Sequence, residues 1–212
     1  MKSTLCALFL LPYLAVVSPQ APAPPQGSAD FLTRQRITSI AVLLPLGDSV
    51  PSAARQLSAD LFDTKLKLRD SALRIFAPDE VTNRLQQQGA TSDFAAMVTL
   101  LSQTGMVNTE AMKKIGQLAG ADGLMVIHVL NYDEEKGSWW YGKGGKNVCR
   151  IQYSLFRVSD GQKVWETLEF RQHDSKVSTN PYPMERVIGD VTDKAVTALL
   201  TDAQHVDVRK KE

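Results

Sequence analysis

The sequence contains little of what most catalytic and metal sites are built from. Its 212 residues include two cysteines and three histidines, and no pair of histidines has the i, i+3 or i, i+4 spacing of a zinc site. The chain has no Gly-x-Ser-x-Gly nucleophile elbow, and Cys149 has no evident base partner in sequence. We therefore expect a protein that is not an enzyme and that holds no metal and no cofactor.

The chain also has almost no excess of one sign of charge over the other. The chain has 24 Lys and Arg against 23 Asp and Glu, a formal net charge of +1. A chain so close to neutral carries no electrostatic footprint for nucleic acid, so we expect no nucleic-acid partner. Removal of a leader would leave Cys149 as a lone cysteine, which excludes an internal disulfide. Because Cys149 falls on the apolar side of an alternating strand, we expect a buried, inert thiol.

The first residues have the pattern of a secretory leader, predicted over 1–20. Lys2 precedes an apolar run over 5–17, and a stretch rich in Pro and Ala follows. The run is shorter than the roughly 20 apolar residues of a membrane-spanning helix, and Pro12 argues against a buried helix. We expect an exported protein that is periplasmic or associated with the cell envelope.

Two details of the leader stay open. Cleavage fits either Val16-Val17-Ser18 or Ala21-Pro-Ala23. Cys6 stands near the start of the apolar run and not at its end, where a bacterial lipoprotein carries its acylated cysteine. The alternative to a released protein is an uncleaved amino-terminal anchor.

The rest of the chain divides into a Pro/Ala-rich linker over 21–35, a single domain over 36–204 and a charged tail over 205–212. Hydrophobic periodicity predicts strands over 37–46, 73–76, 124–130, 147–158 and 164–171, and helices over 52–68 (or from 49), 78–89, 91–101, 109–119 and 184–199.

This order predicts the fold class. The strands over 37–46 and 124–130 are apolar on both faces, so we expect them inside the sheet. The last two strands form an antiparallel hairpin around Asp160-Gly161, with Val164, Leu168 and Phe170 on one face. We predict an α/β (α+β) fold: a mixed sheet of about five strands, helices packed on it, a C-terminal antiparallel hairpin and a closing helix.

Three segments together resemble a superfamily of bacterial envelope accessory domains. They are ITSIAVLLP over 37–45, IGQLAGADGLMVI over 115–127 and YSLFRVSDGQKVW over 153–165. The superfamily includes the amino-terminal domain of the Tol-system propeller protein, the curli secretion lipoprotein, the penicillin-binding-protein activator lipoproteins and GNA-type lipoproteins. The resemblance implies a non-enzymatic module that docks on, or assembles within, a larger envelope machine. The missing lipoprotein cysteine departs from that pattern, and without long alternating segments no pore is expected.

The candidate site is the segment 132–146, which joins two predicted strands. It carries Tyr132 and the adjacent aromatics Trp139, Trp140 and Tyr141, flanked by glycines. Long connections are often functional, and aromatic side chains are frequent interface anchors. We predict a partner-binding surface of these four residues for an envelope protein or a second copy, with peripheral membrane contact as a further option. The alternative is that one Trp folds back and caps the core.

Other patterns in and near this segment have simpler interpretations. Gly137 to Gly144 imitates a phosphate loop but carries three bulky aromatics and precedes a strand, so we expect no nucleotide site. The acidic run 133–135 fits a solvated face, and His128 a satisfied core residue. The strand over 164–171 could accept an added peptide strand at its edge, although its charged residues would discourage such pairing.

The prediction is thus an exported, non-enzymatic accessory protein that binds or assembles with other envelope proteins in secretion, transport or cell-wall machinery. The alternative is a periplasmic carrier of small molecules or lipids that uses 132–146 as a lid. The third interpretation is a hydrolase whose residues meet only in the fold.

Overall fold

A computed structural model describes residues 28–175 and 178–201; the predicted leader and tail, and the linker up to residue 27, lie outside these ranges. The strands are β1 Ser39–Val42, β2 Arg74–Phe76, β3 Gly123–Glu135, β4 Lys146–Arg157 and β5 Lys163–Asp174. The α-helices are α1 Ser28–Arg34, α2 Ser52–Arg69, α3 Pro78–Gln87, α4 Thr91–Thr104, α5 Thr109–Ala119 and α6 Met184–Thr201.

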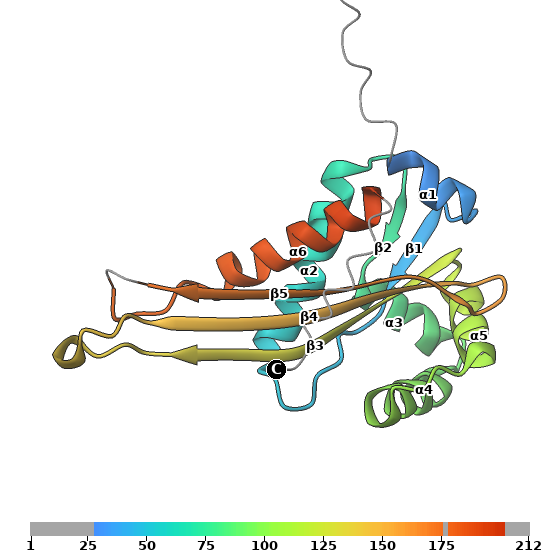
Figure 1. Ribbon diagram of the computed structural model, residues 1–212. Helices are drawn as coiled ribbons and strands as arrows, with labels where there is room; N and C mark the ends of the chain where they lie inside the picture. Colours follow the sequence, from blue (N-terminus) through green and yellow to red (C-terminus); the bar gives the residue numbers. More distant parts are fainter. Residues whose placement is uncertain (1–27, 176–177, 202–212) are drawn as a thin grey trace, which may run out of the picture.

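The five strands form one mixed sheet in the order β2-β1-β3-β4-β5 (Figure 1). β1 pairs in parallel with both β2 and β3, and β3, β4 and β5 form an antiparallel meander. The fold is therefore α+β with a mixed five-stranded sheet, a C-terminal hairpin and a closing helix, as the sequence predicts. The internal position of β1, between β2 and β3 and with helices on both faces of the sheet, explains why its residues are buried on both faces.

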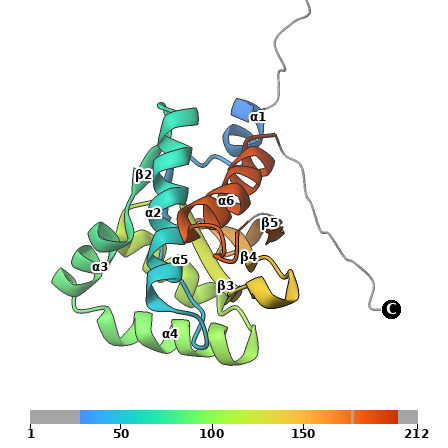
Figure 2. The same cartoon turned by 90° about the vertical axis from the view of Figure 1, so that its left-hand side faces the viewer.

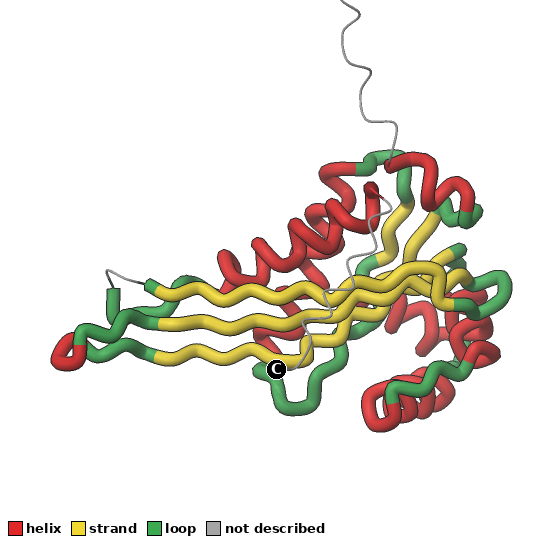
Figure 3. The backbone as a smooth tube through the Cα atoms, viewed as in Figure 1, coloured by secondary structure: helices red, strands yellow, loops and turns green. Residues whose placement is uncertain are grey.

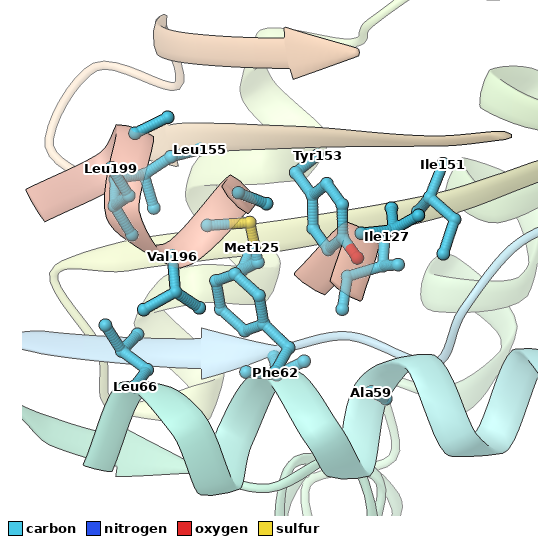
Figure 4. Close-up of a cluster of buried hydrophobic side chains, with 14 of the residues drawn as sticks. Ala59, Phe62, Leu66, Met125, Ile127, Ile151, Tyr153, Leu155, Val196 and Leu199 are labelled. Atoms are coloured by element: carbon cyan, nitrogen blue, oxygen red, sulfur yellow. The ribbon is translucent and has the colours of Figure 1, made fainter. Parts of the chain in front are cut away.

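Helices cover both faces of the sheet, so two hydrophobic cores form. One core lies under α1, α2 and α6, and the other under α3, α4 and α5 (Figures 1 and 2). In the first core the rings of Phe62 on α2 and Tyr153 on β4 stack with centroids 5.4 Å apart (Figure 4). The Tyr153 hydroxyl lies 3.1 Å from the hydroxyl of Thr192 on α6, so the buried phenol keeps a hydrogen-bond partner.

The antiparallel strands β3, β4 and β5 extend past the helices as a long ribbon, which we call the β arm (Figure 3). At about 3.3 Å per residue, strands of this length span roughly 40 Å. The arm's core-facing side chains include Cys149, Ile151 and Tyr153, each fully buried under the helices. The arm thus places its far end well away from α1 and the start of the described chain.

The structure differs from the sequence prediction at the start of the domain. The predicted linker over 21–35 overlaps α1, whose Phe31 and Leu32 are buried in the first core. The Pro-rich residues before them obscure this short helix, because seven residues carry too little periodicity to stand out. The ordered unit therefore begins before residue 36.

The face assignment of β5 also differs from the sequence prediction. Trp165, Thr167 and Glu169, which pair with Leu155, Tyr153 and Ile151, are buried, while Phe170 is 40% exposed. The ladder between β4 and β5 shifts its register at Leu155/Phe156. Because side chains alternate with period two, the face that packs on the helices is set by this register and not by the apolar residues alone.

Candidate functional site

The far end of the β arm presents three adjacent aromatic side chains to solvent. Residues 136–145, which we call the tip, connect β3 to β4, and Trp139–Tyr141 form a single 3-10 turn there (Figure 1). Trp139, Trp140 and Tyr141 are 83%, 90% and 80% exposed. The alternative that one Trp folds back to cap the core is wrong, since both indoles lie on the surface.

The tip is held in one shape by backbone hydrogen bonds. Ser138 N–H donates to Lys143 O over 2.8 Å, and Lys143 N–H donates back to Ser138 O over 3.0 Å. From the segment after β5, Thr179 O accepts from Gly137 N–H at 2.7 Å and Ser178 O accepts from Gly145 N–H at 2.9 Å. The aromatic turn therefore sits on a platform braced by a second stretch of chain.

Two glycines make the close approaches of this platform possible. A Cβ at Gly137 would overlap the carbonyl oxygen of Lys143, and a Cβ at Gly145 would overlap the backbone of Asn180. Gly142 ends the aromatic turn in the left-handed region at φ +60°. The glycines that resemble a phosphate loop thus serve the packing of the tip, and they are followed by β4 and not by a helix.

Tyr132 is separated from the other three aromatics. β3 continues to Glu135, so Tyr132 lies within the strand opposite Cys149, and it is 6% exposed. The connection is therefore 136–145 and not 132–146. Cross-strand pairing with β4 extends β3 into the charged run 133–135, whose side chains are exposed there.

Tyr132 belongs to a cluster of hydrogen-bonded residues, with Glu134, Asn147 and Tyr182, that lies where the tip joins β3 and β4. The fully buried Asn147 accepts from Tyr182 N–H at 2.7 Å and donates from Nδ2 to Tyr182 O at 3.2 Å. Tyr132 donates its hydroxyl proton to Glu134. Burial, together with this hydrogen bond, raises the pKa of Tyr132 far above its usual value, so the phenol is neutral and acts as a donor. The cluster fixes the chain on both sides of the tip.

The tip is basic as well as aromatic. Lys136 and Lys143 lie within it and are exposed, and Lys146 follows directly at the start of β4. No acidic residue occurs between Lys136 and Lys146; the acidic run 133–135 lies on the strand behind. An apolar surface with a cationic collar suits a partner whose matching surface is apolar and ringed by negative charge.

The remaining candidates have structural roles or none that is evident. Cys149 is fully buried, and burial raises the pKa of its thiol to about 12, so the thiolate is inaccessible at neutral pH, as expected of an inert cysteine. His173 Nε2 lies 3.0 Å from Asp190 Oδ2 on α6.

Across residues 28–175 and 178–201, no cluster of three acidic, His or Cys side chains could hold a metal ion. No helix in those ranges is long and apolar enough to cross a membrane.

His128 is only partly buried, unlike the core residue that the sequence predicts. Burial lowers the pKa of its imidazole, an effect that the charge of Asp48 opposes, so the ring is neutral at pH 7. It faces a cavity between the sheet and α4 together with Gln152, Ser154 and Glu166. The alternation of β4 could have indicated this polar group, since Gln152 and Ser154 share its polar face.

Comparison with known proteins shows the fold. No protein-family model and no curated protein matches the sequence. Among solved structures, the dodecamer of a PelC variant from Paraburkholderia phytofirmans aligns with a TM-score of 0.50 at 15% identity, over 78% of this chain and 90% of that one. Lipoprotein GNA1162 from Neisseria meningitidis aligns at 0.49 and 19%, over 78% and 96%.

The C-terminal domain of LpoB from Salmonella enterica aligns with a TM-score of 0.39 at 12% identity, over 69% of this chain and 96% of that one. At such identities the likeness concerns the fold alone. The chain is therefore an α+β domain with an aromatic tip at the end of a long β arm.

Proposed function

We propose that this protein is a non-enzymatic accessory module of the bacterial cell envelope, which docks through its tip on another envelope protein or on further copies of itself. The observation that carries the proposal is the exposure of Trp139, Trp140 and Tyr141 together on a braced platform. The leader pattern at the amino terminus supports a place in the envelope.

The energetic argument rests on the cost of exposing three aromatic rings. Aromatic side chains bury about 150–250 Å² each when covered, so the tip offers roughly 500 Å² to a partner. Patches of this size on soluble proteins usually mark interaction sites. Because the tip is already ordered by backbone hydrogen bonds, little conformational entropy is lost when it docks.

One comparison supports assembly in particular. PelC, which shares the fold at a TM-score of 0.50, forms a dodecamer. A domain of this fold is therefore compatible with a homo-oligomer, and an aromatic tip at the end of an arm can reach a neighbouring subunit. Self-assembly and docking on a different envelope protein are the two forms that the proposal takes.

The test is site-specific photocrosslinking in cells, with the photoreactive residue placed at position 140. Position 68 is the matched control, because Leu68 is also a large exposed apolar residue, at 80%, but lies on α2. We expect a discrete adduct with one protein, or with a second copy, from position 140 and none from position 68. Crosslinks confined to the chain itself would contradict the proposal.

A second candidate is contact between the tip and a membrane surface, which the lysines Lys136, Lys143 and Lys146 favour. Trp and Tyr sit at membrane interfaces, and each Lys near an anionic leaflet contributes about 1 kcal/mol. Flotation with vesicles of phosphatidylglycerol and phosphatidylethanolamine separates the two: membrane contact requires co-flotation that the triple alanine variant at 139–141 loses. The carrier alternative is less well supported, because the polar-floored cavity lies beside α4 and not under the tip.

A further inference from the structure

The face of the sheet beside α4 holds a small cavity that neither the tip nor the assembly role uses. Its volume is about 210 Å³, below the roughly 300–1,000 Å³ of pockets for drug-sized ligands. Leu46, Leu101, Val107 and Phe156 supply apolar walls from four different parts of the chain. The size limits an occupant to a small molecule, and the walls favour one with an apolar part.

One side of the cavity is polar and carries one charge of each sign, Glu166 on the floor and Lys163 at the rim. Gln152 Nε2, Ser154 Oγ and Lys163 Nζ all donate to Glu166 Oε1, at 2.7, 2.9 and 2.7 Å. These three bonds use one carboxylate oxygen and leave Oε2 with none of them. Burial raises the pKa of Glu166, but the three donors outweigh it and the pKa is lowered, so Glu166 is a carboxylate at neutral pH.

The side chains that line the cavity have further hydrogen-bonding capacity for a ligand. Neutral His128 presents one donor and one acceptor nitrogen, and it pairs across the ladder with Gln152, whose amide oxygen is an acceptor. Lys163 is half-exposed at the rim, so its ammonium can reach a ligand as well as Glu166. A ligand that carries both charges would therefore meet an opposite charge at each end.

We propose that this cavity binds a small zwitterion, an α-amino acid with an apolar side chain. Its ammonium lies against Glu166, its carboxylate meets Lys163 and His128, and its side chain lies between Leu101 and Phe156. The net charge of Lys163 and Glu166 is zero, which matches a zwitterion better than a simple amine or a simple carboxylate.

The test is a titration of the ¹⁵N-labelled full chain, followed by NMR, with L-leucine as the probe. Two analogues with the same apolar side chain are the ligand controls: 3-methylbutylamine, which lacks the carboxylate, and 4-methylpentanoate, which lacks the ammonium. We expect L-leucine to shift the amides of 126–130, 152–156 and 163–166 saturably, and each analogue to bind at least tenfold more weakly. No saturable shift with L-leucine, or equal binding of all three probes, would overturn the proposal.

Substitutions of Glu166 and Lys163 test which of these residues binds the ammonium and which binds the carboxylate of the ligand. Glu166→Gln should weaken L-leucine binding at least tenfold, whereas Asp174→Asn, on the same strand but outside the cavity, should leave it unchanged. If Glu166→Gln fails to fold, Lys163→Met is the second variant: it should weaken L-leucine but not 3-methylbutylamine. Retained L-leucine affinity in both variants would contradict the assignment. Triple alanine substitution at 139–141 should not change leucine binding, so this site and the tip are tested separately.

Discussion

At the scale of single residues, Asp122 joins the start of β1 to the start of β3. Its Oδ2 accepts hydrogen bonds from Thr38 N–H at 3.0 Å, Thr38 Oγ1 at 2.6 Å and Ser39 Oγ at 3.0 Å. Burial raises the pKa of Asp122, but these hydrogen bonds outweigh it, and the pKa lies below its usual value. The carboxylate therefore stabilises the fold only while it is ionised.

Asp122→Ala should lower the free energy of unfolding at pH 7 by about 2 kcal/mol, because hydrogen bonds to a charged group contribute about 1.5–3 kcal/mol. A depressed pKa means that this contribution is present above pH ~4 and disappears as the pH falls further. Urea unfolding at pH 7 and at pH 3 measures both effects. A difference between the two proteins that is independent of pH would contradict the role assigned to the ionised carboxylate.

Substitutions of Tyr132 and Trp140 should have different effects on stability, although the sequence predicts one site that contains both residues. Tyr132 is 6% exposed, so Tyr132→Ala should cost about 3 kcal/mol or more, as expected for a large-to-small change in a core. Trp140 is 90% exposed, so Trp140→Ala should change stability by no more than about 0.5 kcal/mol. Thermal unfolding of both variants checks this, and a large loss with Trp140→Ala would mean that the tip is structural.

At the scale of elements, α5 packs on Val158, the residue that follows β4, at a distance that only glycine permits. A Cβ at Gly116 would overlap the side chain of Val158. Gly116→Ala should therefore destabilise the protein by about 1–3 kcal/mol through overpacking, despite the better helix propensity of Ala. Adding Val158→Ala should recover part of the loss, and strictly additive effects in a double-mutant cycle would argue against this contact.

In the tip, the effect of the backbone conformation on partner binding can be tested separately from the effect of the three aromatic side chains. Gly137→Ala keeps all three aromatics but places a Cβ on the carbonyl oxygen of Lys143. We expect crosslinking from position 140 to drop severalfold while global stability changes by less than about 2 kcal/mol, because the tip lies outside the two cores. Gly142, with open space around a Cβ but φ +60°, is the comparison: Gly142→Asn should be tolerated. Unchanged crosslinking in Gly137→Ala would show that the braced shape is not required.

At the scale of the whole molecule, the two cores differ in how firmly they hold their helices. α6 buries ten of its residues against the sheet, α1 and α2, whereas α4 buries only Phe94 and Met97 and leaves Leu100 exposed. Hydrogen exchange should therefore show α6 amides opening only with global unfolding and α4 amides opening locally at a lower free energy. Equal protection of the two helices would mean that the second core is as cooperative as the first.

Much of the fold was predictable because its elements are long and periodic. The stripe of Val187, Val191 and Ala195 predicts α6, and the doubly apolar strand over 124–130 predicts an internal position for β3. Shorter or register-dependent features were not predictable. α1 has seven residues, and the buried face of β5 depends on how its residues pair with those of β4.

The sequence by itself determined the class of fold, the neutral surface and the aromatic character of the tip, since these follow from local periodicity and composition. The tertiary structure decided that Trp139, Trp140 and Tyr141 face solvent while Tyr132 is buried. Tyr132 is buried because β3 still pairs with β4 at this position, where Tyr132 lies opposite the buried Cys149. It also decided the cavity beside α4, which needs residues from β3, β4, β5 and α4 to meet. Contacts between residues that are distant in sequence depend on strand order and register, and no local stretch of sequence encodes these.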